Sequence, residues 1–151
     1  LEDSGLILRQ LATHRGALVA SPGLVAQLGI PATPDDISRF DTLSMTSRSG
    51  EYVIALTAPD GAVHRVRHTP RLVTDDMEAL RQAALAGIGL AALPRLLVHD
   101  DIEAGRLTAL LPDYELPGGL AHVVFPSRRG LIPAVRLFMD ELPGAFRDSL
   151  N

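Results

Sequence analysis

The chain has 151 residues, a formal net charge of −4 and a pI of about 5.7. This length is enough for one domain with a real core or for two small lobes, and the acidic balance gives no sign of a phosphate-binding surface. The absence of cysteine excludes disulfides and thiolate metal sites, and no apolar run approaches the ~20 residues that cross a bilayer. We therefore expect a soluble, cytoplasmic protein with no membrane partner.

The first part of the chain predicts short elements separated by turns. Apolar or alternating runs predict five strands, over residues 6–11, 17–20, 43–45, 51–58 and 62–68. Pro59-Asp60-Gly61 separates the last two and predicts a hairpin. Two short helices are expected, over residues 24–28 and 33–40, the second with Thr33 as its N-cap and Pro34 as its first helical residue.

The stretch over residues 71–94 carries the most consistent local signals. After a strand, Asp75 is predicted to be the N-cap of a helix, and Glu78 completes an Asp-x-x-Glu arrangement close to the capping box. Gly87 is predicted to end this helix at a position that needs positive φ. The uncharged run over residues 88–93 then predicts a strand buried on both sides, which completes a βαβ crossover.

The last part of the chain predicts elements around one linker. Before the linker we expect short helical turns over residues 95–98 and 101–104 and a strand over residues 107–111. The linker is DYELPGG, residues 113–119. After it we expect a strand over residues 120–125 and a final helix over residues 132–142.

The crossover also predicts where a ligand binds. In open α/β sheets, ligands lie beyond the carboxyl ends of the strands and beside helix N-termini. We therefore expect a cleft bordered by Thr74, Asp75 and Asp76 at one strand end and by Leu93 and Pro94 at the next.

Several runs together resemble the effector-binding domain of LysR-type transcriptional regulators. They are ASPGLVAQLGIPATPDDISRFDTL over residues 20–43, the hairpin turn, residues 75–114 and HVVFPSRRGLIPAVRLFMDEL over residues 122–142. The most specific piece is ALAGIGLAALP, followed by an acidic turn, AGRL and LLPDY. The resemblance is collinear from about Gly5 to the end of the chain.

This resemblance implies an α/β, two-lobed, periplasmic-binding-protein-like fold with mixed sheets and a small-molecule cleft at the hinge. It places residues 1–20 and 119–151 in an incomplete first lobe and residues 21–118 in the second lobe. It also implies that the DNA-binding winged helix-turn-helix is absent from this chain, so that DNA is a partner only through a missing domain. A homodimer or tetramer is expected of the full-length protein.

The resemblance further implies that the effector is contacted at Thr46, Ser47, Asp75, Asp76, Met77, Ser127 and Arg128. Two of these residues have an alternative interpretation. Asp75 is equally consistent with a purely capping role, and Arg128 lies in a Ser-Arg-Arg-Gly turn that is typical of a solvated surface. An Asp at position 75 disfavours an anionic effector at that spot.

Other site chemistries have little support in the sequence. Residues 87–92 fit the pattern G-x-G-x-x-A, but they follow a helix instead of a strand, which argues against a dinucleotide site. Residues 99–103, HDDIE, are interpreted as a solvated surface turn and not as a metal site, and His64 and His68 as solvated residues at a sheet edge. Neither a G-x-S-x-G elbow nor a P-loop occurs, so we expect no enzyme, no cofactor and no metal.

We interpret the chain as the effector-sensing domain of a LysR-type regulator, in which a small-molecule effector shifts a conformational equilibrium. Two alternatives stay open at this point. One is a solute-binding protein of a transport system, and the other is a small α/β enzyme. Helix-turn-helix residues upstream of Leu1 would exclude both.

Overall fold

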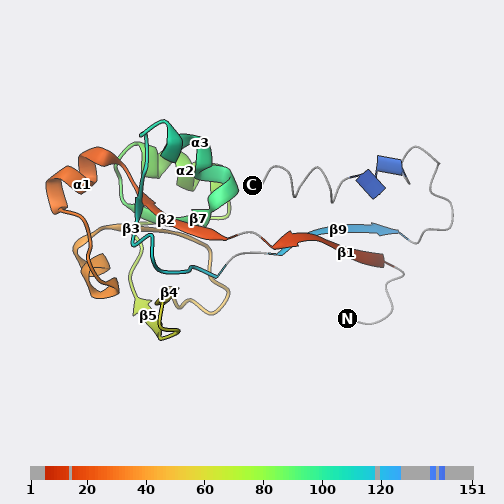
Figure 1. The fold of residues 1–151 in the computed structure, drawn as a ribbon, viewed down its shortest axis with the longest axis horizontal. Helices are drawn as coiled ribbons and strands as arrows, with labels where there is room; N and C mark the ends of the chain where they lie inside the picture. The colour runs from red at the N-terminus through yellow and green to blue at the C-terminus, as the bar shows by residue number, and fades with distance from the viewer. Residues whose placement is uncertain (1–5, 14, 118–119, 127–136, 139, 142–151) are drawn as a thin grey trace. The chain divides into compact units, whose positions relative to one another are not determined.

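The computed structural model describes residues 6–13, 15–117, 120–126, 137–138 and 140–141 (Figure 1). The chain divides into two compact units, the first made of residues 1–14 and 118–151 and the second of residues 15–117. Among the described residues, no helix has the length and apolar character needed to span a membrane.

The first unit contains an antiparallel strand pair. β1 (Leu6–Thr13) pairs with β9 (Leu120–Pro126), and the register shifts between Gln10 and Ala12. Of the helix predicted over residues 132–142, residues 137–138 and 140–141 are described, and they are helical.

The second unit is built on a mixed sheet of five strands. In spatial order these are β6 (Leu72–Thr74), β3 (Thr42–Met45), β7 (Leu90–Pro94), β2 (Gly16–Ala20) and β8 (Thr108–Leu110). β3 runs parallel to β6 and β7, whereas β2 runs antiparallel to β7 and β8. The carboxyl ends of β6, β3 and β7 therefore meet at one edge of the sheet. The amino end of β2 lies at the same edge, because Gly16 pairs with Pro94.

The lobe division expected from the resemblance stays a prediction, and the two compact units differ from it at residue 118, which lies in the first unit, and at residues 15–20. Residues 15–20, which the resemblance puts in the first lobe, belong to the second unit. The physical reason is that β2 is an interior strand there, hydrogen-bonded to β7 on one side and to β8 on the other.

Two helices cover one face of this sheet, α2 (Met77–Leu85) and α3 (Arg95–Glu103) (Figure 1). The buried side chains of that face form one cluster, which includes Val19, Leu43, Leu80, Ala84, Ala91, Leu93 and Val98. The predicted βαβ unit is confirmed as β6, α2 and β7, but β7 is not buried on both sides as predicted, because Ala92 is exposed.

The opposite face is covered by α1 (Pro22–Leu28), the 3₁₀ helix η1 (Pro34–Arg39) and the hairpin of β4 (Val53–Thr57) and β5 (Val63–Arg67). Their buried side chains form a second cluster, which includes Leu18, Val25, Ile37, Leu56, Leu90 and Leu110. The predicted hairpin is confirmed, with Ala58 N donating to Ala62 O over 2.8 Å and Gly61 at φ +86°.

The start of α2 corrects the predicted cap. Asp76, not Asp75, is the N-cap, because its carboxylate accepts from Glu78 N at 2.9 Å and Ala79 N at 3.3 Å. The Glu78 carboxylate turns to Arg81 instead of closing a capping box. The end of the helix is as predicted, with Gly87 at φ +75°.

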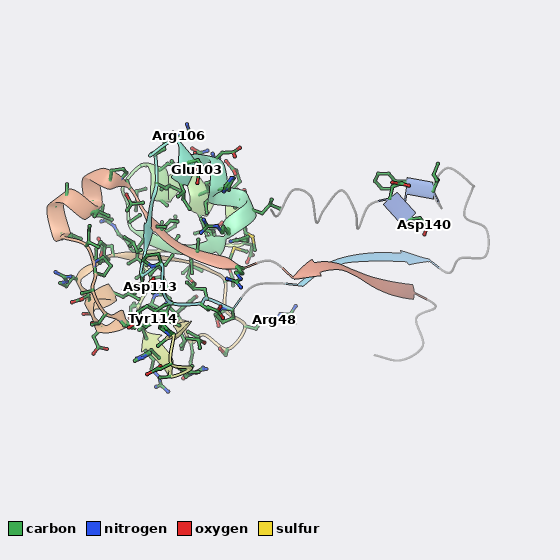
Figure 2. The ribbon with its side chains drawn as sticks, viewed as in Figure 1. Arg48, Glu103, Arg106, Asp113, Tyr114 and Asp140 are labelled. Carbon is green, nitrogen blue, oxygen red and sulfur yellow. The ribbon has the colours of Figure 1, made fainter. Side chains whose placement is uncertain are left out.

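The region after Pro94 also differs from the prediction. The two expected helical turns form one helix, α3, and Asp101 within the supposed solvated turn is only 1% exposed. Its carboxylate accepts from Arg81 Nε at 2.6 Å and from Arg106 Nε at 2.7 Å. Arg106 lies just beyond the end of α3 (Figure 2). The two guanidinium groups supply the compensation that a buried carboxylate requires.

Candidate functional site

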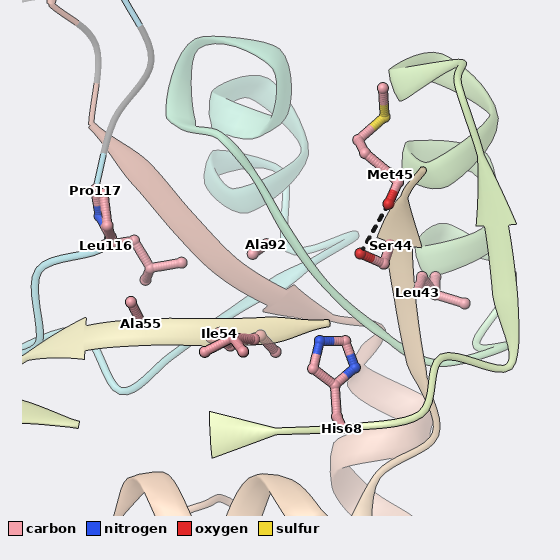
Figure 3. Close-up of a pocket in the computed structure, with 10 residues that line it drawn as sticks. Leu43, Ser44, Met45, Ile54, Ala55, His68, Ala92, Leu116 and Pro117 are labelled. Carbon is pink, nitrogen blue, oxygen red and sulfur yellow. Dashed lines mark hydrogen bonds between the residues drawn. The ribbon is translucent and has the colours of Figure 1, made fainter. Parts of the chain in front are cut away.

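A pocket of about 250 Å³ lies between the sheet of the second unit and the β4–β5 hairpin (Figure 3). It is lined by Leu43, Ser44, Met45, Val53, Ile54, Ala55, His68, Ala92, Leu116 and Pro117. Three of these are the last residues of β3, so the pocket lies at the carboxyl end of that strand.

Strand alternation explains which side chains face the pocket. Successive residues of a strand point to opposite faces. Leu43 and Met45 pack towards the helical face of the sheet, so Ser44 belongs to the hairpin face. In β7, Ala91 and Leu93 likewise pack towards the helical face, so Ala92 belongs to the hairpin face. A hydroxyl and a small methyl group are therefore placed beneath the hairpin.

His68 is fixed above β3 by three interactions. Its backbone N–H donates to Tyr52 O over 3.1 Å, and its ring lies 6.1 Å from the Tyr52 ring. Its Nδ1 is 2.7 Å from Oγ1 of Thr42, which is only 3% exposed. Burial lowers the pKa of His68 below its usual value of 6.5, so the ring is neutral at pH 7.

The interpretation of the two hairpin histidines as solvated edge residues is therefore wrong. The hairpin folds over β3, which brings His68 onto a buried hydroxyl. His64 packs edge-on against Tyr114, with the ring centroids 5.8 Å apart.

The far wall of the pocket, Leu116 and Pro117, is held by backbone pairing. Thr57 and Glu115 exchange two N–H···O bonds of 2.8 Å, and Gly16 forms a bridge with Leu116. A Cβ on Gly16 would lie only 2.9 Å from Leu116 Cβ, so the bridge depends on glycine. The wall is thus positioned by both the sheet and the hairpin.

A second hollow of about 290 Å³ is also lined by His68. It is lined by Gly50, Glu51, Tyr52, Arg67, His68 and Thr69. It carries two charged side chains, Glu51 and Arg67, in contrast to the mainly apolar pocket beneath the hairpin.

The protein comparisons identify the family. Residues 1–147 match the family model described as LysR substrate binding domain. The chain belongs to this family. Its fold class, predicted as mixed α/β of the periplasmic-binding-protein type, is thereby confirmed.

Curated relatives of this LysR substrate-binding domain are transcriptional regulators. The chain is 30% identical to the uncharacterized HTH-type transcriptional regulator YhjC of Escherichia coli K12, over all of the chain and 51% of that protein. It is 31% identical to the HTH-type transcriptional regulator PtxR of Pseudomonas aeruginosa, over 93% of the chain and 45% of that protein. The chain therefore spans about half the length of the curated relatives it matches.

Solved structures agree with the family assignment. The regulatory domain of CrgA, a LysR-type transcriptional regulator from Neisseria meningitidis, is 28% identical with a TM-score of 0.77, over 95% of this chain and 71% of that one. The full-length virulence activator AphB of Vibrio cholerae is 21% identical with a TM-score of 0.79, over 96% of this chain and 49% of that one, which shows the likeness of fold.

The site residues predicted for this LysR domain fall into three groups. The first lies at the carboxyl edge of the sheet, where Thr46 N donates to Thr74 O over 3.2 Å and the Ser47 and Ser49 hydroxyls lie 3.0 Å apart. Asp75 follows β6 and is exposed, and among the described residues its side chain has no hydrogen bond or ion pair. Met77, at the start of α2, is 44% exposed.

The second group has a structural role in the domain. The Asp76 carboxylate is occupied by the α2 N-terminus. Leu93 is 2% exposed and belongs to the core beneath the helices, so its side chain does not border an open cleft. Pro94 is half-buried at the junction with α3. The third group, Ser127 and Arg128, lies outside the described residues.

The pocket beneath the hairpin contains none of these predicted residues. Its polar groups, Ser44 and His68, were not among the candidates from sequence. One usable signal is the alternation of Thr42 and Ser44, two hydroxyl residues on one face of a short strand that is otherwise apolar.

Proposed function

We propose that this chain is the effector-sensing part of a longer transcriptional regulator and that a small molecule binds at the carboxyl edge of its second-unit sheet. The observation that carries the proposal is the pocket of about 250 Å³ at the end of β3, in a domain of the LysR substrate-binding family. In sheets with parallel strands, this is the edge where ligands bind. The relatives support a regulator and give no support to a transport protein or an enzyme.

In this proposal, Thr46, Ser47, Asp75 and Met77 form the rim of the site, because they follow the carboxyl ends of β3 and β6. Ser127 and Arg128, which the family resemblance implies, remain part of the proposed set of effector contacts. The longer protein is a cytoplasmic homodimer or tetramer and contacts DNA through another domain. The effector acts by binding one arrangement of the two lobes more tightly than the other.

The test blocks the pocket without unfolding the domain. Ala92 lines the pocket and is solvent-exposed, so Ala92→Leu fills part of it. Ala79→Leu adds the same atoms at an exposed position of α2 and is the matched control. A metabolite library is screened against the 151-residue chain by thermal shift, and each hit is then added to the full-length regulator on its operator DNA.

We expect Ala92→Leu to abolish both the thermal shift and the change in DNA binding, while Ala79→Leu keeps both. An effector response that survives in full-length Ala92→Leu protein would remove the pocket from the mechanism. The 151-residue chain alone should give no mobility shift with duplex DNA at moderate salt, because its net charge is −4. A clear shift would contradict the assignment of DNA binding to another domain.

A further inference from the structure

We propose that the pocket selects a small uncharged molecule that presents a carbonyl-type oxygen to Nε2–H of His68, and that His68 is the residue that determines this specificity. The inference rests on the proposed function and adds the chemical class of its effector. It is carried by the hydrogen bond between His68 and Thr42 and by the absence of charged side chains among the described residues that line the pocket.

The tautomer of His68 follows from the surroundings of Thr42. The Thr42 hydroxyl is buried, and among the described residues its one hydrogen-bond partner is His68 Nδ1. If Nδ1 carried the proton, the hydroxyl hydrogen would be left without an acceptor, which buried polar groups avoid. The hydroxyl therefore donates to Nδ1. A neutral imidazole carries one proton, so it sits on Nε2.

The Nε2–H group is available to a ligand. No hydrogen bond of Nε2 occurs within the part of the chain that the structure describes, and no fully buried side-chain N or O atom there lacks a partner, so Nε2 is not fully buried. The ring extends towards the space between Ile54 and Ser44 (Figure 3). His68 thus offers one N–H donor to the pocket.

Ser44 supplies the complementary group. Its hydroxyl donates to Met45 O over 3.2 Å, so its oxygen lone pairs stay available to accept. The other side chains that line the pocket are hydrocarbons or, for Met45, a thioether. The pocket therefore combines one donor and one acceptor with apolar walls, a combination typical of sites for small organic ligands.

Charge decides between ligand classes. None of the ten lining residues is Asp, Glu, Lys or Arg, and the pKa of His68 is lowered by burial, so the ring supplies no cation at neutral pH. A carboxylate or ammonium group that moves from water into this pocket meets no opposite charge on the lining residues, and this desolvation is costly. An amide, ketone or lactone avoids this cost and still satisfies Nε2–H.

The experiment uses the ¹⁵N-labelled 151-residue chain and three probes of one size: cyclohexanecarboxamide, cyclohexanecarboxylate and cyclohexylmethylamine. Long-range ¹H–¹⁵N spectra of the imidazole rings first report the tautomer of His68, and titrations then give a Kd for each probe. We expect the Nε2–H tautomer, and we expect the amide to bind at least about tenfold more tightly than either ion and to shift the His68 ring signals.

His68→Leu should weaken amide binding by about tenfold or more, because a lost hydrogen bond in an enclosed site is worth about that factor. His99→Leu is the matched control, since His99 is exposed on α3, and it should leave the Kd unchanged. An Nδ1–H tautomer, equal or tighter binding of an ion, or an amide that leaves the His68 signals unmoved would each overturn the inference.

These outcomes are separable from a failure of the proposed function. Ion binding in this pocket would refute the uncharged class while leaving effector sensing intact. Conversely, amide binding to the chain with an unchanged effector response in the full-length Ala92→Leu regulator would keep the chemistry of the pocket and refute its role in regulation.

Discussion

Replacing the buried carboxylate of Asp101 tests how the helical face of the second unit is held together. Asp101 is 1% exposed and joins α3 to Arg81 of α2 and to Arg106 beyond α3. Asp101→Asn keeps the size of the side chain and one carbonyl oxygen but removes the charge. Two hydrogen bonds of 2.6 and 2.7 Å from arginine to a carboxylate are thereby replaced by at most one bond from arginine to an uncharged carbonyl oxygen.

The magnitude follows from the exposure of the three side chains. Removing one partner of a buried ion pair costs roughly 3–5 kcal/mol, because the other charge is left uncompensated. Here the arginine side chains are 22% and 56% exposed, so water can hydrate them in part. We therefore expect the lower end, a loss of about 3 kcal/mol in the free energy of unfolding. For a unit of this size, at about 4 °C or more per kcal/mol, that corresponds to a melting temperature lower by about 12 °C or more.

The pH dependence gives a second readout with a defined sign. Hydrogen bonds from Arg81, then from Arg106, hold the pKa of Asp101 below its usual value of 3.8, against the opposing effect of burial. A carboxyl whose folded-state pKa is lowered stabilises the fold above its unfolded pKa and loses this contribution as the pH falls through the folded value. The difference between wild type and Asp101→Asn should thus be constant near neutral pH and shrink below pH 3.8.

The assay is thermal and urea unfolding between about pH 3 and pH 7, with Asp100→Asn as the matched control. Asp100 is the preceding residue on α3, and its carboxylate is exposed. Its replacement should change stability by less than about 0.5 kcal/mol. If the two variants lose equal stability, or if the Asp101→Asn difference does not depend on pH, the buried carboxylate is not what joins the two helices.

Two further predictions concern single positions, and urea unfolding measures both. Asp76→Ala removes the acceptor of two α2 N–H groups and should cost about 1 kcal/mol, whereas Asp75→Ala should cost almost nothing; the reverse order would return the cap to Asp75. Gly89→Ala places a Cβ 2.6 Å from the Asp41 carbonyl oxygen and should cost about 2 kcal/mol. Gly23→Ala, whose Cβ would meet nothing within 4 Å, is its control, and equal stability of the two would contradict the steric argument.

Local signals predicted most of the second unit, because the physics that forms those elements acts within a few residues. The turn at Pro59-Asp60-Gly61 and the helix ends at Gly29 and Gly87 depend on backbone conformations that favour glycine or proline. Where two adjacent residues have the same chemistry, as Asp75 and Asp76 do, sequence alone did not decide which one caps the helix.

Contacts between residues far apart in the sequence could not be predicted from local patterns. The sequence indicates a strand over residues 17–20, but nothing within that run specifies that β2 lies between β7 and β8. The burial of Asp101 likewise depends on Arg81, which is 20 positions away in the sequence. The run HDDIE was therefore predicted to be a solvated turn, although its Asp101 carboxylate is buried and joins α3 to α2.

In the candidate site, too, the residues at strand ends were predicted and the contacts between distant segments were not. Asp75 was predicted from the general rule for strand ends, and Thr46, Ser47 and Met77 from the family resemblance, so the rim stays a prediction. The pocket beneath the hairpin was missed, because it exists only once the hairpin has folded over β3. Thr42 and His68 lie 26 positions apart in the sequence, and no local pattern indicates that they share a hydrogen bond.

The position of the pocket also matters for the proposed response to an effector. Leu116 and Pro117 line its wall, and Pro117 is the last residue of the second unit before the chain continues into the first. Gly16, which forms a bridge with Leu116, lies near the other crossing between the units. A ligand in contact with Leu116 therefore touches the residue that pairs with Gly16 within the second unit. Within the proposed function, binding that favours one geometry of the Gly16–Leu116 bridge would supply the differential interaction that a population shift requires.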